Sequence, residues 1–213
     1  MTDPTLYLIT PPTIQDLGSF AEVLSRALDA ADGSVACLQL RLKDVSDDEV
    51  LRTAEAIAPV VGAAGAGFLI NDRADLAAKC DADGVHLGQS DGSVAEARTL
   101  LGADKDIGVT CHNSIHLAME AGEAGADYVA FGAFFPTATK EVEFHAEPDL
   151  LTRWAEMATV PTVAIGGITA ETALSLLEAG ADYLAVSGAI WNHPDGAEAG
   201  VKAFLKAIRE TGA

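Results

Sequence analysis

Short apolar runs alternate along this chain with longer segments in which apolar residues recur at helical spacing. The runs are rich in Val, Ile, Leu and Phe, which is typical of buried strands. The segments between them, such as 45–61 and 114–125, are rich in Ala, Leu and Glu. Short strands that alternate with helices predict a parallel sheet covered by helices. The eight predicted strands are residues 6–10, 35–43, 67–72, 84–89, 107–112, 128–135, 161–168 and 183–190.

The predicted helices also carry signals at their ends. Ser46 precedes an acidic first turn of Asp47, Asp48 and Glu49, which suits the positive end of a helix dipole. The pattern A-G-A-D-Y occurs at 124–128 and again at 179–183. In each copy a glycine can end a helix, and an apolar strand follows at once. The two copies therefore indicate repeated strand and helix units.

The number of predicted strands favours a closed barrel. Eight strands with intervening helices predict an α/β fold of the TIM (β/α)8 barrel type, and 213 residues fit a single catalytic domain over 1–213. The polar motifs come at the carboxyl ends of the strands, where barrel active sites are built. A doubly wound open sheet is the structural alternative.

Charge and cysteine content narrow the classes of function. A formal net charge of −19 repels nucleic acid and anionic membranes, so we expect neither as a partner, although solubility also explains the acidity. Three cysteines without paired spacing, and the absence of a signal peptide pattern, predict a reduced, cytoplasmic protein. A homodimer is left open at this stage.

The second predicted strand carries two cations. Its sequence CLQLRLKD alternates leucines with Gln39, Arg41 and Lys43, and period two sends each set to one side of the sheet. We expect the polar set to face the interior of the barrel near its mouth. Two cations placed there need an anion, and a diphosphate would satisfy both. A solvated face of an edge strand is the alternative.

Acidic residues follow the next two predicted strands. Asn71 and Asp72 end the third strand, and Asp91 follows the fourth. Two carboxylates beside a diphosphate match the way in which Mg²⁺ is held, with water and substrate oxygens as further ligands. The alternative is that Asp72 and Asp91 only cap the helices that follow them.

The fifth predicted strand ends in GVTCH. Thr110 and His112 could hydrogen-bond a heterocycle, whereas Cys111 is expected to point away from both. No activating partner for Cys111 is evident, which argues against a nucleophile. We interpret His86, in the fourth strand, as a structural residue or as one that supports residues in contact with substrate.

The last three predicted strands indicate a phosphate site. The sixth runs into FFPTATK, where Thr137, Thr139 and Lys140 suit a phosphate group, with an ordinary loop as the alternative. Glycines after the seventh and eighth strands let backbone N–H groups approach an anion, as in the recurrent phosphate site of such barrels.

Taken together, QLRLKD, LINDRADLA, GVHLGQSD, GVTCH, FGAFFPTATK, AIGGI and YLAVSGAI resemble the thiamine phosphate synthase family, in order and over nearly the whole chain. The resemblance implies a transferase that joins hydroxymethylpyrimidine diphosphate to thiazole phosphate and releases diphosphate, with Mg²⁺. It implies Mg²⁺ ligation by Asp72 and Asp91, and roles in the reaction itself for Arg41, Lys43, Thr110 and Lys140. It implies that Gln39, Arg41, Lys43, Asn71, Thr110 and Lys140 hold the pyrimidine substrate, and that Thr137, Ala138, Thr139, Gly167, Ser187 and Gly188 hold the thiazole phosphate.

Two positions depart from the family pattern. Thr110 stands where the family usually has Ser, and Ser187 with Gly188 replaces the usual end of the eighth strand. A thiazole tautomerase is the nearest alternative, but that family tends to lack the paired metal carboxylates that are present here. A paralogue that only binds thiamine intermediates, or another barrel enzyme acting on phosphates, is a further alternative that a turnover assay would test.

Overall fold

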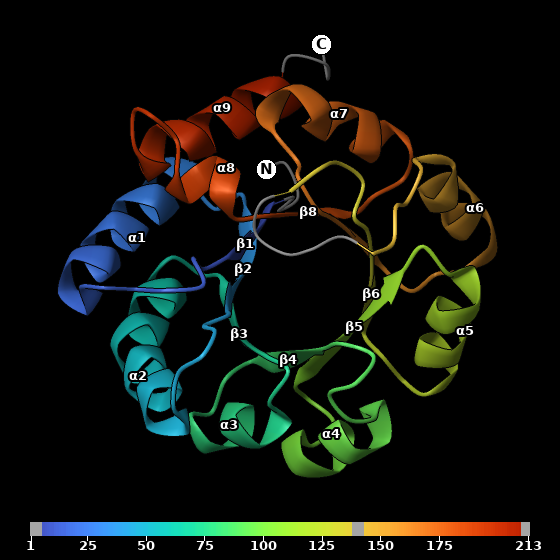
Figure 1. Cartoon of the computed structure of the whole chain (residues 1–213), viewed down its shortest axis with the longest axis horizontal. Helices are drawn as coiled ribbons and strands as arrows, with labels where there is room; N and C mark the ends of the chain where they lie inside the picture. Colours follow the sequence, from blue (N-terminus) through green and yellow to red (C-terminus); the bar gives the residue numbers. More distant parts are fainter. Residues whose placement is uncertain (1–5, 138–142, 210–213) are drawn as a thin grey trace.

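The computed structural model describes residues 6–137 and 143–209, which form eight parallel strands closed into a barrel with helices on the outside (Figure 1). Strand order follows the sequence, and β1 pairs with both β2 and β8, so the sheet has no free edge. The strands are β1 (Leu6–Ile9), β2 (Val35–Leu40), β3 (Gly67–Asn71), β4 (Gly84–Leu87), β5 (Asp106–His112), β6 (Tyr128–Phe131), β7 (Thr162–Ile165) and β8 (Tyr183–Val186).

Helices follow the strands and cover the outer face of the barrel (Figure 1). The short helix α8 comes directly after β8, and the last helix packs against α1 and α7. The helices are α1 (Leu17–Ala31), α2 (Asp47–Ala63), α3 (Ala74–Lys79), α4 (Val94–Leu101), α5 (Ile115–Glu123), α6 (Asp149–Met157), α7 (Ala170–Glu178), α8 (Gly188–Trp191) and α9 (Ala197–Arg209).

The predicted barrel is confirmed, and the doubly wound alternative is wrong because β8 closes on β1. All eight strands begin within two residues of their predicted first residue, but most end earlier than predicted. The largest differences are at β6 and β8, which end at Phe131 and Val186, whereas the predictions extended to 135 and 190. The trailing residues leave the ladder of hydrogen bonds and form the loops at the mouth of the barrel.

Apolar side chains fill two separate layers. The larger lies between the sheet and the helices, and it takes up Leu38 and Leu40 of β2, as period two predicts. Gln39, between them, points to the interior, where it is 2% exposed. A smaller cluster fills the inside of the barrel, and it comprises Tyr7, Ile9, Leu69, Tyr128, Ala130, Val163 and Ala185.

The aspartate of the repeated G-A-D pattern has a defined structural role. In each copy its carboxylate accepts a hydrogen bond from a backbone N–H near the start of the preceding strand, and so ties neighbouring strands together at their amino ends. The same bond occurs in a third unit of the barrel. The pairs are Asp83 with Phe68, Asp127 with Ile107 and Asp182 with Thr162, each at 2.7 Å.

Other local predictions also hold. Ser46 caps α2, and its hydroxyl accepts a hydrogen bond from the N–H of Glu49 at 3.2 Å. In the parts of the chain that are described, no helix combines the length and the apolarity that a bilayer crossing requires.

Candidate active site at the carboxyl end of the barrel

The predicted site residues gather on one rim of the barrel because parallel strands all end there. Gln39, Arg41, Lys43, Asn71, Asp72, Asp91 and Thr110 lie at or after the ends of β2 to β5, and Thr137, Gly167, Ser187 and Gly188 follow β6 to β8. The predicted residues Ala138, Thr139 and Lys140 lie outside the described residues.

The end of β1 organises the start of this rim. Thr10 is 1% exposed, and its hydroxyl accepts a hydrogen bond from the N–H of Arg41 at 2.9 Å. Its carbonyl oxygen accepts a bond from the hydroxyl of Ser187 at 3.3 Å. Thr10 therefore connects the exits of β2 and β8. The sequence prediction treated this residue as part of a strand and missed the contact, because a buried threonine in an apolar strand carries no pattern.

The two cations after β2 differ in their surroundings. Arg41 is half-buried, whereas Lys43 is exposed on the loop toward α2, with its N–H bonded to the carbonyl of Pro12 at 3.0 Å. The predicted alternation placed both on the interior face of one strand. The strand ends at Leu40, so both cations follow β2 instead of lying on it, and only the exposed Lys43 lies fully on the loop surface. The wet edge strand alternative is also wrong, since β2 pairs on both sides.

A carboxylate pair stands at the ends of β3 and β4. Burial, followed by the charge and a hydrogen bond of Asp91, raises the pKa of Asp72 to about 6. The positive charge of Arg41 and a hydrogen bond from Asn71 act in the opposite direction. Asp72 therefore lies near Asp91, Arg41 and Asn71, and a cation bound between the two carboxylates would relieve their mutual repulsion.

Hydrogen bonds with the backbone hold Asp72 and Asp91, which we call the carboxylate pair. Asp72 has a positive φ of 64°, and its N–H bonds to the carbonyl of His86 at 2.7 Å. The Oδ2 atom of Asp91 accepts a bond from the N–H of Gly88 at 3.1 Å. A left-handed conformation is uncommon for a residue with a side chain, although Asp tolerates it better than most. Such local strain is often retained at functional positions.

Neither carboxylate caps a helix. The residue at the cap position of α3 is Arg73, and the cap of α4 is Ser93. The hydroxyl of Ser93 accepts from the N–H of Glu96 at 3.2 Å, and the carboxylate of Glu96 accepts from the N–H of Ser93 at 2.9 Å. The capping alternative is therefore wrong for Asp72 and for Asp91, and helix stability does not account for either.

The chemistry of the carboxylate pair fits a hard divalent cation. Among residues 6–137 and 143–209, no cluster of three or more His, Cys, Asp or Glu side chains is placed to hold a metal ion. The protein would thus supply two carboxylates, and water and substrate oxygens would complete the coordination. This is the usual arrangement for Mg²⁺, whereas Zn²⁺ takes more protein ligands, typically His or Cys.

A chain of hydrogen bonds crosses the inside of the barrel beneath the rim. The Gln39 amide nitrogen lies 2.8 Å from the hydroxyl of Tyr7, which lies 2.9 Å from the hydroxyl of Tyr128. His86 Nδ1 lies 3.0 Å from the same Tyr128 oxygen, and its Nε2 lies 2.8 Å from Thr110 Oγ1. We call these five residues the interior chain. The sequence prediction named Gln39, Thr110 and His86 but missed both tyrosines.

At the end of β5, Cys111 points to the opposite side of the strand from Thr110 and His112. Cys111 is 0% exposed in the outer apolar layer, and burial raises the pKa of its thiol to about 12. This confirms that it points away from Thr110 and His112, and it excludes a thiolate nucleophile near neutral pH. The His112 ring packs on Phe144 with 4.5 Å between ring centroids, where the segment after β6 returns to the rim.

Backbone rather than side chains dominates the ends of β7 and β8. Gly166 and Gly167 have φ values of 102° and 65°. A Cβ at Gly167 would lie 2.3 Å from the carbonyl oxygen of Pro136, so the loop after β6 packs directly on this glycine. Ser187 stands at the start of α8, where the first N–H groups of the helix have no acceptor within the helix.

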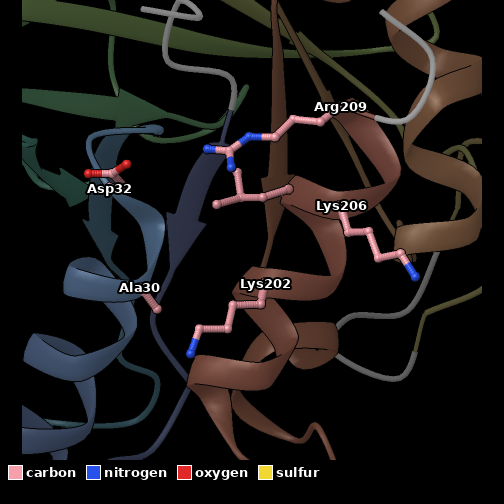
Figure 2. A pocket seen from close by; sticks show the side chains of 6 residues that line it. Ala30, Asp32, Lys202, Lys206 and Arg209 are labelled. Atoms are coloured by element: carbon pink, nitrogen blue, oxygen red, sulfur yellow. The ribbon is translucent and has the colours of Figure 1, made fainter. Parts of the chain in front are cut away.

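A cleft of about 540 Å³ lies elsewhere, between α1 and α9 (Figure 2). Lys202 and Arg209 reach from α9 toward its opening, whereas Lys206 points away (Figure 2). Asp32, which follows α1, offsets part of the positive charge, and Lys202 also pairs with Glu198 at 3.0 Å. No residue of this cleft lies at the carboxyl end of a strand, so it is separate from the candidate site.

Comparison with known proteins agrees with this geometry. The family model described as thiamine monophosphate synthase matches residues 6–190. A thiamine-phosphate synthase of Rhodospirillum centenum is 59% identical over 209 residues, which cover 98% of this chain and 100% of that protein. One of Erythrobacter litoralis is 50% identical over 205 residues, covering 95% and 94%. The solved thiamine phosphate pyrophosphorylase of Pyrococcus furiosus has a TM-score of 0.82 at 29% identity, covering 97% of this chain and 96% of that chain.

Proposed function

This chain belongs to the thiamine monophosphate synthase family, and from that premise we propose that its barrel mouth joins hydroxymethylpyrimidine diphosphate to thiazole phosphate. The products are thiamine phosphate and diphosphate. The observation that carries the proposal is the carboxylate pair of Asp72 and Asp91 beside Arg41, with helix capping excluded for both acids.

The carboxylate pair favours a synthase over a thiazole tautomerase. A tautomerase handles no diphosphate, and two adjacent carboxylates would only repel a substrate that is already anionic. Asp72 and Asp91 would instead hold Mg²⁺, and the ion would attract the diphosphate and supply neutralisation of charge on the leaving group. The pair costs electrostatic repulsion in the free protein, which supports a role with a cation.

The reaction calls for stabilisation of a leaving group more than for a base. The bond between the pyrimidine methylene carbon and the diphosphate oxygen breaks, and its electron pair leaves with diphosphate. The lone pair of the thiazole nitrogen then forms the new C–N bond. Arg41, Lys43 and Lys140 would bind the diphosphate as its negative charge grows, which is the charge that a preorganised site stabilises most. The buried, protonated thiol of Cys111 has no part in such a scheme.

The two substrates would occupy different halves of the rim. Asn71, Thr110 and Gln39 stand on the side proposed for the pyrimidine. Gln39 is 2% exposed and its amide nitrogen faces Tyr7, which favours action through the interior chain over direct contact. Thr137, Ala138, Thr139, Gly167, Ser187 and Gly188 would hold the thiazole phosphate, largely through hydroxyl and backbone N–H groups.

The partners of the enzyme are small molecules, as its family implies. The net charge of −19 supports the prediction that it binds neither nucleic acid nor anionic membrane. Cytoplasmic location, a single domain over 1–213 and homodimer formation stay predictions.

The decisive experiment is turnover by the purified protein. Both substrates are supplied with Mg²⁺, and thiamine phosphate and diphosphate are measured by separate assays. We expect equal amounts of the two products and no turnover after chelation of the metal. Isomerisation of the thiazole precursor without release of diphosphate would favour the tautomerase, and binding of both substrates without any product would favour a binding paralogue.

A further inference from the structure

The interior chain connects the centre of the barrel with the proposed pyrimidine side of the rim. Its members come from β1, β2, β4, β5 and β6, and each contact lies between 2.8 and 3.0 Å. Four of the five side chains are buried, and Thr110 is half-buried at the mouth. A buried polar group without a hydrogen-bond partner costs free energy, so each donor hydrogen of the interior chain should meet an acceptor. The count of donors and acceptors therefore determines which way the hydrogen bonds point.

The direction follows from Gln39. Its amide nitrogen can only donate, so the Tyr7 oxygen accepts this bond. The single hydrogen of Tyr7 then goes to Tyr128, the other hydroxyl in contact with it. Burial raises the pKa values of Tyr7 and Tyr128 well above the usual range, so both phenols keep their hydrogens over the whole physiological range of pH.

The same count sets the direction of the hydrogen bonds from Tyr128 through His86 to Thr110 at the rim. Tyr128 accepts from Tyr7 and therefore donates its hydrogen to Nδ1 of His86. A neutral imidazole that accepts at Nδ1 carries its hydrogen on Nε2, and this hydrogen points to Thr110 Oγ1. The hydroxyl hydrogen of Thr110 is then directed away from His86.

We propose that the interior chain fixes His86 in its Nε2–H form and so makes Thr110 a dedicated hydrogen-bond donor to the pyrimidine ring. His86, Tyr128 and Tyr7 are positioning residues in this account, since they act through Thr110. A pyrimidine ring offers nitrogen lone pairs as acceptors, which a hydroxyl constrained to donate would recognise. The proposal rests on the proposed function for the identity of the substrate, but the state of His86 follows from the contacts alone.

Packing around the chain supports a constrained geometry. The His86 and Tyr128 rings stack at 24° with 5.6 Å between centroids, and Tyr7 meets Tyr128 edge to face. A Cβ at Gly108 would lie 1.9 Å from the Tyr128 ring, so this glycine makes room for it. Gln89 holds the other side of Thr110, because its amide nitrogen donates to the Thr110 carbonyl at 2.6 Å.

The test combines a spectroscopic and a kinetic measurement on the full-length protein. Long-range proton–nitrogen correlation NMR of protein with ¹⁵N-labelled histidine distinguishes Nε2–H from Nδ1–H, and a His86→Asn variant identifies the His86 signals among the five histidines. We expect Nε2–H for His86 at neutral pH in the protein without substrate. A hydrogen on Nδ1 would overturn the proposal, because the chain would then run inward and Thr110 would accept from substrate.

The kinetic arm tests whether the chain acts through Thr110. Thr110→Val and Tyr128→Phe should each lower kcat/KM by about three- to tenfold, as expected for one hydrogen bond between neutral groups. The double variant should lose no more than Thr110→Val alone, and Thr110→Ser should keep most activity. Losses that multiply would overturn the proposal, since they would indicate independent roles.

Tyr183→Phe is the matched control. Tyr183 packs against the same inner cluster, and none of the four contacts of the interior chain involves it, so removal of its hydroxyl should leave His86 in its Nε2–H form. If Tyr128→Phe does not fold, the His86 spectrum of the wild-type protein still decides between the two directions. Failure of the proposed function would appear separately, as absence of thiamine phosphate from the wild-type protein with an Nε2–H His86.

Discussion

Strands β2 to β5 present side chains to the mouth of the barrel, whereas β7 and β8 present mainly backbone. On the first side stand Arg41, the carboxylate pair and Thr110, each oriented by contacts beneath it. On the second side Gly167 lies under the loop after β6, and α8 begins directly at the end of β8. Single substitutions on the first side can therefore change how the site recognises charged groups of the substrate. Substitutions on the second side also disturb the packing of the backbone.

The largest effect is expected from the carboxylate pair. Asp72→Asn and Asp91→Asn each remove a hard anionic oxygen, and we expect activity to fall on the order of a hundredfold. Thermal stability should not fall, because neither residue caps a helix and each substitution relieves repulsion between the two carboxylates. Steady-state kinetics with Mg²⁺ in excess, together with thermal melts, measure both effects.

Ser93→Ala is the control for this prediction. It removes the true cap of α4 and should cost about 1 kcal/mol of stability with activity unchanged. Full activity in both Asp72→Asn and Asp91→Asn would contradict the claim that the first side of the rim acts through its side chains.

Arg41→Ala should lower kcat/KM by more than about tenfold, mainly through the diphosphate substrate, since a charge-assisted contact contributes roughly 1.5–3 kcal/mol. Lys140→Ala is expected to act in the same direction. Arg52→Ala, at an exposed position of α2 where the side chain is 68% accessible, is the matched control and should have no effect. An unchanged kcat/KM in both Arg41→Ala and Lys140→Ala would contradict the assignment.

Gly167→Ala should affect the fold more than the chemistry. The added Cβ would meet the Pro136 carbonyl at 2.3 Å in a backbone of positive φ, so we expect a loss of about 1–3 kcal/mol in the free energy of unfolding. Gly62→Ala, inside α2 with open space around it, should instead gain about 0.5–1 kcal/mol. Urea unfolding curves measure both. An unchanged stability in Gly167→Ala would show that the loop yields easily.

The smallest effect is expected at Ser187. Its hydroxyl donates to the Thr10 carbonyl at 3.3 Å, so Ser187→Ala removes a long bond and leaves the backbone N–H groups of the rim in place. We expect at most about a threefold rise in KM for thiazole phosphate. A rise beyond tenfold would mean that the hydroxyl itself binds the phosphate, and that the second side also acts through side chains.

The sequence was informative where periodicity and spacing carry the signal. The eight strands and the α2 cap at Ser46 could be predicted because strands buried on both faces form short apolar runs and a cap needs a particular residue type. Strand ends were predicted too late, as at Lys43, because polar residues that leave the sheet continue the alternation for several positions.

The relations between strands could not be predicted. Sequence spacing left open whether Asp72 and Asp91 cap helices, because that depends on where α3 and α4 begin in space. Tyr7 and Tyr128 lie 121 positions apart, and nothing in two apolar strands shows that their hydroxyls meet. Gly167 was interpreted through phosphate binding alone, whereas its contact with Pro136 requires a loop that only the folded chain brings near.

The most direct test of the central claim is a calorimetric titration of Mg²⁺ into the protein saturated with hydroxymethylpyrimidine diphosphate, without thiazole phosphate. We predict a single binding event in the wild-type protein and in Ser93→Ala, with affinity at least about tenfold weaker in Asp72→Asn and in Asp91→Asn. Equal Mg²⁺ affinity in all four proteins would contradict the claim that the carboxylate pair holds the metal at the mouth of the barrel.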